Sequence, residues 1–371
     1  MEILPKTLGT RPRLAVEVRA EGVVAARAED ATAVLTAVSR ADLVEGAVAP
    51  GLKAGNIVNR TAVTASLRSV LDAVAGSGRE RLRDVTVIVP DAAVRVLFVD
   101  FDQLPSKAAE ALPVVRFRLK KLLPFDADEA MVSYQVMSTE KDSVKLLAVA
   151  MPKAVLEEYE SAVLAAGYLP GAVLPSTLAA LAGLDESEAP VLVVNAGLGT
   201  VTTAIVQAGI LTLHRSVDMS AGDMNVSGNA PLTVTSVLPV VSRESTAQEW
   251  AQQEPLGPDG WDRFDAETAM QASMVETAVT REIEARAAAR EVAQAVSVAA
   301  AYFEDSLQRP PDQLLVAGTL GAELLTAMME ESGLEGLRVR EMVEPGMIEP
   351  GAVRVSVPRG WLAGVRGALR N

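Results

Sequence analysis

Apolar and polar residues alternate along Leu14–Ala28 on either side of Gly22, as they do in two β-strands joined by a tight turn. Apolar residues then recur at helical spacing over Ala62–Val74, and the run Gly76-Ser77-Gly78 ends this predicted helix. The following stretch returns to alternation and then to helical spacing. It predicts strands over Val85–Val89, Ala93–Phe101, Met131–Met137 and Val144–Ala150, and helices over Ser106–Leu122 and Lys153–Ala166.

The second half of the sequence begins with another buried strand and a glycine-rich turn. Between about residues 220 and 275 the periodicity weakens, and Gly-Pro-Asp-Gly at 257–260 is typical of a turn, so we expect a loop-rich segment there. The regular patterns on either side predict strands over Val191–Asn195, Val201–Val206, Ile210–Ser216 and Gln313–Ala317, and helices over Glu276–Leu307 and Ala322–Glu331.

The order of these elements predicts an α/β protein of two lobes. A chain of 371 residues is long for a single core. Strand–strand–helix–strand–strand–helix over residues 85–166 indicates a small α+β module inserted in the first lobe. Because each half begins with a hairpin, we expect the two hairpins to face a cleft. The predicted domains are residues 1–187, with the module, and 188–371, with the segment at 220–275.

Composition narrows the range of functions. The chain carries 34 Lys and Arg against 48 Asp and Glu, a formal net charge of −14. Phosphate backbones and anionic lipid headgroups repel such a surface, so we expect neither nucleic acid nor lipid as a partner. The first residues lack the pattern of a signal peptide, and no apolar run of about 18 residues occurs. These features predict a cytoplasmic protein that does not insert into the membrane.

The sequence contains no cysteine and a single histidine, His214. Disulfides, thiolate catalysis and metal sites made of several Cys or His residues are therefore excluded. A bound metal would be a hard cation such as Mg²⁺, held by carboxylates. His214 stands on a predicted strand without an evident acid–base partner, so we expect a structural or surface role for it.

Four segments of the chain carry a family resemblance when they are taken in order. They are VTVIVPDAAVRVLFVDFDQLP at 85–105, RFRLKKLLPFDADEAMVSYQV at 116–136, AGYLPGAVLP at 166–175 and LAGVRGALR at 362–370. This set resembles PilM of type IV pilus assembly, a relative of the division protein FtsA in the actin/Hsp70 ATPase superfamily. The similarity covers most of the chain except about residues 220–275. It implies an actin-like (ribonuclease H-like) fold of two lobes, with the α+β module in the first.

The resemblance also implies a cleft for ATP with Mg²⁺, built from two hairpins that each carry an Asp-x-Gly motif. In this sequence Glu17 stands for the first Asp and Arg19 for its Gly, and Asn195 stands for the second Asp. An arginine side chain obstructs the close approach of phosphate to the backbone, and Glu21 repels phosphate. The positions that correspond to the nucleotide site are Glu17, Asn195, Gly197, Gly199, Thr200 and Gly318.

The retained glycines leave nucleotide binding open, whereas the lost Asp residues argue against efficient hydrolysis. We therefore predict a degenerate ATPase site and assign no catalytic residue. The same glycines at Gly197 and Gly199 also suit a tight hairpin that binds nothing. These two interpretations make different demands on the surrounding side chains.

PilM-like proteins bind a short N-terminal cytoplasmic peptide of the inner-membrane protein PilN, in a groove between the first lobe and the inserted module. The resemblance implies that this chain is a docking scaffold of the pilus assembly platform. It would lie at the inner membrane through a PilN-like protein and other platform proteins. Core packing is the competing interpretation for each candidate groove residue, namely Val96, Phe98, Phe101, Leu104 and Phe117.

Two other classes of protein fit parts of this pattern. A nucleotide-dependent switch or ATPase of the same superfamily, such as a sugar-kinase relative, needs an acidic catalytic residue, for which the hairpins offer Glu17. A type II secretion component of the GspL kind would carry a transmembrane helix. Elsewhere we expect the basic run 116–121 to be a solvated helix face or a site for an acidic partner. The acidic cluster 126–129 is predicted as a solvated turn, and Trp361 as a packed side chain.

Overall fold

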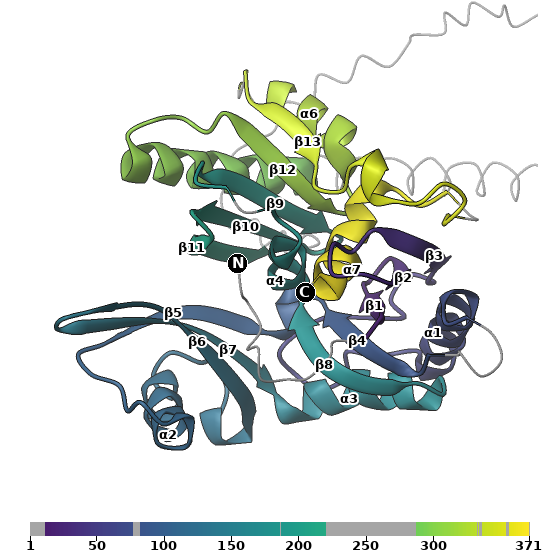
Figure 1. Ribbon diagram of the computed structural model, residues 1–371, viewed down its shortest axis with the longest axis horizontal. Coiled ribbons are helices and arrows are strands. Elements are labelled where there is room, and N and C mark those ends of the chain that lie inside the picture. The colour runs from purple at the N-terminus through teal and green to yellow at the C-terminus, as the bar shows by residue number, and fades with distance from the viewer. Residues whose placement is uncertain are drawn as a thin grey trace, which may run out of the picture. The chain divides into compact units, whose positions relative to one another are not determined.

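Three β-sheets organise the described part of the chain in the computed structural model (Figure 1). The described residues are 12–76, 82–185, 187–219, 287–331, 333, 336–353 and 356–370. Contacts divide the chain into a unit of residues 1–219 with 290–371 and a unit of residues 220–289. All three sheets belong to the first unit. The predicted loop-rich segment at 220–275, and residues 276–286 of the predicted helix Glu276–Leu307, lie outside the described residues.

The first sheet confirms the predicted hairpin and adds three strands to it. Its order is β3-β2-β1-β4-β8, with β1 antiparallel to β2 and parallel to β4. Alternate residues of β1 point to opposite faces, so Leu14 and Val16 pack under α1 and α3 while Ala15 faces the other way. The elements are β1 (Leu14–Val18), β2 (Gly22–Ala28), β3 (Leu35–Asp42), β4 (Asp84–Val89), β8 (Leu169–Pro175), α1 (Arg60–Val74) and α3 (Lys153–Ala165).

The second sheet repeats the order and strand directions of the first. Its order is β11-β10-β9-β12-β13, with β9 antiparallel to β10 and parallel to β12. One face packs against α6 and the helix over 287–307, through Leu192 and Val194, whereas Val193 faces the core shared with the first sheet. The elements are β9 (Val191–Gly197), β10 (Thr200–Gln207), β11 (Ile210–Asp218), β12 (Gln313–Gly318), β13 (Arg338–Glu341) and α6 (Gly321–Glu331).

Two short helices, α4 (Ser176–Ala182) and α7 (Leu362–Leu369), pack together in a core that includes residues of both five-stranded sheets. The contact between them is tight enough to require glycine: a Cβ on Gly367 would lie 1.9 Å from the carbonyl oxygen of Ala179. Trp361 is buried beside this core with the Arg40 guanidinium over its ring, which confirms the expectation that it packs. One hydrophobic core therefore joins the two sheets through their facing sides.

The third sheet forms the predicted α+β module. Its order is β5-β7-β6, made of β5 (Arg95–Phe101), β7 (Ser143–Pro152) and β6 (Ala130–Glu140), and α2 (Ala108–Leu119) covers one face. β4 and α3, at the margins of the predicted 85–166 range, belong with the first sheet instead. Within the described residues, no helix combines the length and the apolar composition needed to cross a membrane.

Candidate functional site

The turn of the first hairpin carries charged side chains into the interior. Glu17 ends the inward-facing row of β1, and Arg19 follows the strand, so both side chains reach the space between the two five-stranded sheets. Glu17 is fully buried, and Arg19 is 7% exposed. Their ion pair joins Arg19 Nη2 to Glu17 Oε1 at 2.6 Å. A buried pair of this kind persists only when its remaining donors and acceptors are also satisfied.

The N-terminus of α4 supplies part of that satisfaction. Ser176 Oγ donates to Glu17 Oε1 at 2.6 Å and accepts from Arg19 Nη2 at 2.9 Å. Glu17 Oε2 has no hydrogen-bond partner and packs against α7, where a Cβ on Gly364 would lie 2.4 Å from it. Burial raises the pKa of Glu17, and the positive charge of Arg19 and the hydrogen bond from Ser176 partly offset this effect.

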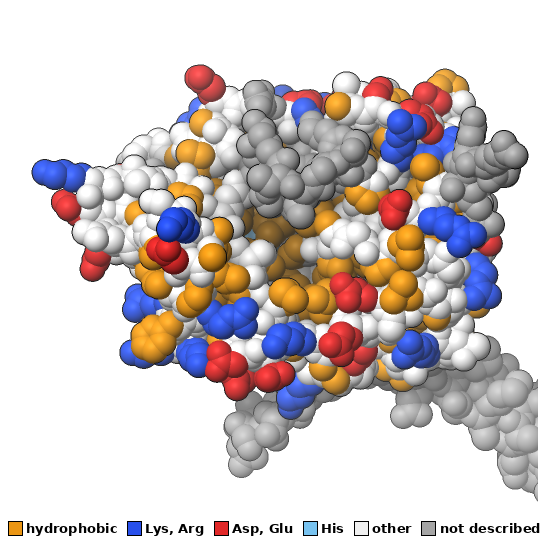
Figure 2. All heavy atoms as spheres, turned by 60° about the horizontal axis from the view of Figure 1, so that its bottom comes forward, with side chains coloured by type: hydrophobic (Ala, Val, Ile, Leu, Met, Phe, Trp, Pro, Cys, Tyr) orange, Lys and Arg blue, Asp and Glu red, His pale blue; other side chains and the backbone are white. Residues whose placement is uncertain are grey.

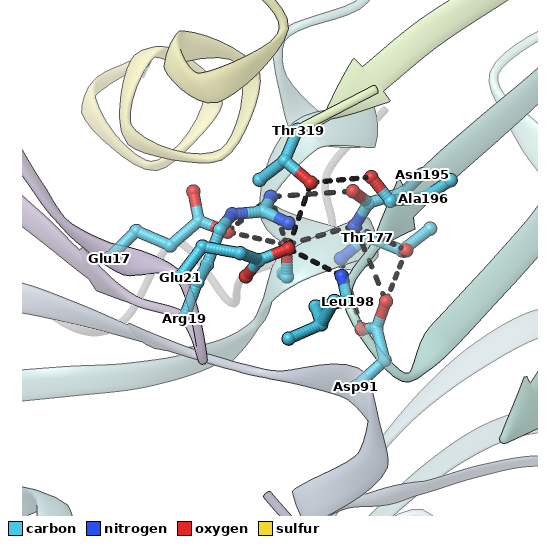
Figure 3. Close-up of polar contacts among 10 residues, drawn as sticks. Glu17, Arg19, Glu21, Asp91, Thr177, Asn195, Ala196, Leu198 and Thr319 are labelled. Carbon is cyan, nitrogen blue, oxygen red and sulfur yellow. Dashed lines mark hydrogen bonds and ion pairs between the residues drawn. The ribbon is translucent and has the colours of Figure 1, made fainter. Parts of the chain in front are cut away.

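Asn195 joins this group from β9 of the second sheet. Its Oδ1 accepts from Arg19 Nη2 at 3.3 Å, and its Nδ2 donates to Ser176 Oγ at 2.9 Å and to Thr177 Oγ1 at 2.9 Å. Asp91 accepts hydrogen bonds from both the backbone N–H and the hydroxyl of Thr177. Figure 3 shows that these side chains converge from separate elements. The amide of Asn195 therefore serves a protein network and leaves no carboxylate at this position for a metal.

Glu21 makes a direct connection between the two hairpin turns. Its Oε1 accepts a hydrogen bond from the backbone N–H of Leu198, in the β9–β10 turn, and another from Thr319 Oγ1 at 2.8 Å (Figure 3). Thr319 is held in place by its own N–H, which donates to the carbonyl oxygen of Ala196 at 2.8 Å. The expected cleft is therefore bridged by a side chain at the point where the hairpins face each other.

The glycines predicted for a nucleotide site allow protein groups to approach closely. A Cβ on Gly197 would lie 3.1 Å from Glu21 Oε1, and one on Gly318 would lie 2.2 Å from the carbonyl oxygen of Ala196. Gly318 also has a φ of +95°. Gly199 has a φ of +84° with no protein atom near the position of a Cβ, so it serves the turn, and Thr200 pairs with Gly197 across it.

Residues at the ends of parallel strands complete this site, and the motif comparison missed them. Asp91 follows β4, Ser176 and Thr177 follow β8, and Thr319 follows β12. Carboxyl ends of parallel strands meet at one edge of a sheet, which is where the polar groups of α/β proteins gather. The Pro-Asp and Pro-Ser-Thr sequences after two apolar runs were the signal that could have found three of them.

The groups present do not fit a nucleotide with its metal. Arg19 and Glu21 extend into the space between the hairpin turns, and Glu21 already uses the Leu198 N–H and the Thr319 hydroxyl. Among the described residues, no set of three or more His, Cys, Asp and Glu side chains is arranged to hold a metal ion. Nucleotide binding by this cleft therefore stays a sequence-based prediction that the side-chain arrangement disfavours.

His214 lies on β11 beside the same network. It lines a pocket of about 280 Å³ between β11 and the start of β5, together with Asp91, Arg95, Arg215, Asp218 and neighbouring residues. Its Nε2 is buried and has no hydrogen-bond partner. Burial lowers the pKa of His214, and the nearby Asp91 carboxylate partly offsets this effect. The sequence analysis found no acid–base partner for this histidine, and the structure places the Asp91 charge close to it.

The five candidate groove residues do not share one surface. Val96 and Phe98 lie on the face of the three-stranded sheet away from α2, and Phe98 is 42% exposed. Phe101 and Leu104 pack against the core under α2, as the competing interpretation expects. Phe117 lies on α2 itself and is 68% exposed. Figure 2 shows hydrophobic side chains gathered around a hollow on one face of the molecule, with Lys and Arg side chains nearby.

The basic run 116–121 and the acidic cluster 126–129 largely contact each other. Arg116 Nη1 donates to the carbonyl oxygens of Ala127 and Ala130, and Lys120 Nζ pairs with Asp128 at 2.6 Å. Asp126 accepts from the backbone N–H of Asp128 and so shapes the turn. These contacts explain the two clusters as parts of one surface turn.

Together, the repeated sheet topology and the bridged hairpins define a protein of actin-like fold, as predicted. A chain of the PilM–PilN type IV pilus biogenesis complex matches this structure with a TM-score of 0.65 and 16% sequence identity, over 96% of this chain and 98% of that one. This likeness confirms at the level of the fold the resemblance to PilM drawn from the sequence.

Other solved structures match at lower TM-scores. A Bacteroides thetaiotaomicron protein with an actin-like ATPase fold matches at a TM-score of 0.38 with 10% identity, over 91% of this chain and 93% of that one. The cytoplasmic domain of EpsL, an inner-membrane component of the Vibrio cholerae type II secretion system, matches at 0.37 with 14% identity, over 56% and 71%. No protein-family model matches the sequence, and a comparison with curated proteins gives no match either.

Proposed function

We propose that this protein is a docking component of a type IV pilus assembly platform, and that it binds the N-terminal peptide of a PilN-like membrane protein. The observation that supports this most strongly is the match to a chain of the PilM–PilN complex. The match covers 96% of this chain and 98% of that one, so it extends over the module as well as the two lobes. In this role the protein lies at the cytoplasmic side of the inner membrane through its partners.

The module offers a surface suited to an extended peptide. β5 is an edge strand of the three-stranded sheet, and edge strands present backbone groups to which another strand can add. Phe98 on β5 is 42% exposed, and Met131 on β6 is 52% exposed. An apolar peptide side chain gains free energy when it covers such residues. Val96 and Phe98 are therefore the candidate groove residues that we retain for the peptide, and Phe117 is a second contact on α2.

The cleft supports a scaffold more than an ATPase. Its charged groups, Glu17 and Arg19, are paired with each other and with neighbouring side chains. A catalytic carboxylate must instead be free to orient water or a metal. In this proposal the actin-like lobes provide a rigid support that carries the module, and turnover of ATP has no part in docking.

The test is calorimetric titration of the protein with a synthetic peptide that covers the N-terminal cytoplasmic residues of the PilN-like protein from the same organism. We expect the variant Phe98→Asp to weaken binding by about tenfold or more, since a buried aromatic anchor is lost and a charge is introduced. Phe117→Asp tests the second contact in the same way. Leu324→Asp is the matched control, because Leu324 is 49% exposed on α6 of the second lobe. Absent peptide binding, or an equal loss in the control, contradicts the proposal.

A further inference from the structure

Three hydrogen-bonding groups converge at the turn of the second hairpin. The backbone N–H of Leu198 and the hydroxyl of Thr319 both donate to Glu21 Oε1. The Arg19 guanidinium is the third: the position of a Cβ on Gly197 lies 3.1 Å from Glu21 Oε1, 3.5 Å from Arg19 Nη1 and 3.6 Å from Thr319 Oγ1. A backbone amide, a hydroxyl and a guanidinium around one point are the donors of an oxyanion site.

We propose that these groups form an oxyanion site whose ligand is the protein's own Glu21 carboxylate. The N–H of Leu198, the hydroxyl of Thr319 and the positive charge of Arg19 would accept an oxygen of inorganic phosphate in the same manner. In the wild-type chain Glu21 fills the site from the first hairpin. The inference goes beyond the docking role and does not depend on it.

The attachment of each partner explains why this contact acts as a bridge. Glu21 belongs to the turn between β1 and β2, whereas Leu198 follows β9 and Thr319 follows β12. A single carboxylate oxygen thus ties the first sheet to two neighbouring strands of the second. Gly197 is required beside it, since a larger residue would place its Cβ 3.1 Å from the bound oxygen. The bridge needs no ligand from solution, so it holds the hairpins together at all nucleotide concentrations.

The half-buried position of Glu21 favours an internal ligand over a chance surface contact. Arg19 is 7% exposed and already pairs with Glu17. Its second charge interaction, with Glu21, therefore forms in a region where solvent screening is weak. A carboxylate tethered two residues from Arg19 also loses less entropy on binding than a free anion does.

The experiment is a titration of full-length Glu21→Ala with inorganic phosphate, followed by calorimetry and by the shift in melting temperature. We expect phosphate to bind this variant at least about tenfold more tightly than wild type, because the loss of Glu21 frees hydrogen bonds to charged groups. Acetate should likewise raise the melting temperature of the variant and leave that of wild type unchanged. Glu45→Ala is the control for net charge, since Glu45 lies exposed outside the site.

A second variant separates the site from a general effect on stability. Glu21→Ala combined with Thr319→Val removes one donor of the site, and it should lose most of the phosphate response. Equal phosphate responses in wild type and Glu21→Ala would overturn the inference, as would an undiminished response in the double variant. If Glu21→Ala fails to fold, Glu21→Gln, which keeps an acceptor oxygen, provides the comparison with wild type. Titration with the PilN-like peptide on the same variants tests the docking proposal separately.

Discussion

At the scale of single residues, the site is defined by charges that are buried and paired. Glu17 and Arg19 stand where a motif comparison expects an acid and a glycine, and their pair satisfies both charges inside the molecule. Substitution of an ion pair by its two partners in sequence is visible in a motif. The partners Ser176 and Asn195 are not, because their contribution depends on the way four separate elements meet.

His214 gives a pH dependence that can be assigned to one residue. Its pKa in the folded protein is lowered from 6.5 by burial, with Asp91, Asp218, Arg95 and Arg215 as the other charged groups around it. The unfolded chain then binds the proton more readily, so stability is present above about pH 6.5 and is lost as pH falls below it, by at most about 1.4 kcal/mol per pH unit. His214→Gln should remove this loss.

The measurement is the free energy of unfolding in urea at pH 7.5 and pH 5.5, for wild type and variant. Glu17 acts in the opposite direction: its raised pKa gives stability that is present below 4.5 and is lost as pH rises through its folded value. Glu17 is common to both proteins, so the difference between them isolates His214. The sequence holds no other histidine, and equal pH dependence in the two proteins would therefore contradict the assignment.

At the scale of elements, strong periodicity located most helices and strands, and weak periodicity concealed four. β3, β8, β13 and α4 were not predicted. β8 contains Pro170 and Gly171, which an isolated sequence marks as a turn, yet it lies at the sheet edge, where proline is tolerated. α4 has only seven residues, too few for a periodic signal. Tertiary packing in the shared core determines the structure of both elements.

The two glycines of the second lobe that a motif comparison treats alike should behave differently. Gly318→Ala places a Cβ 2.2 Å from the carbonyl oxygen of Ala196. Because β12 and β9 are paired at this point, neither strand can move away, and we expect a loss of about 2–5 kcal/mol in the free energy of unfolding. Gly199→Ala meets no neighbouring atom and should cost only about 1–2 kcal/mol for its positive φ.

Urea denaturation of both variants, with peptide titration on the folded fraction, provides the measurement. Equal losses for the two glycines would show that the backbone angle alone matters and that close strand packing does not. A loss confined to Gly199→Ala would contradict the packing described for β9 and β12.

At the scale of the whole molecule, the actin-like fold could be predicted from the sequence because the two halves each begin with an extended hairpin and because four ordered segments resemble PilM. The position of the α+β module also followed from the order of elements. The bridge between the hairpins could not be predicted. Glu21 meets Leu198 and Thr319 at separations of 177 and 298 residues, and no local pattern records such distant contacts.

A bridged molecule should dock its partner without control by nucleotide. We expect the affinity for the PilN-like peptide to be the same with and without ATP and Mg²⁺ at millimolar concentration. Allosteric coupling between a nucleotide site and the docking surface would instead change this affinity by about fivefold or more. Calorimetric titration of the peptide under both conditions is the measurement, and ADP in place of ATP is its control. A change of that size would show that the cleft still receives a nucleotide.

The position of α7 has a consequence for biosynthesis. This helix, near the end of the chain, packs against β1 and β2 near its beginning and against β12 of the other sheet. A nascent chain that is still attached to the ribosome therefore lacks the piece that covers the inner faces of both sheets. Because the partly made protein exposes these apolar faces during translation, chaperones that hold nascent chains have a defined surface to protect until residue 369 emerges.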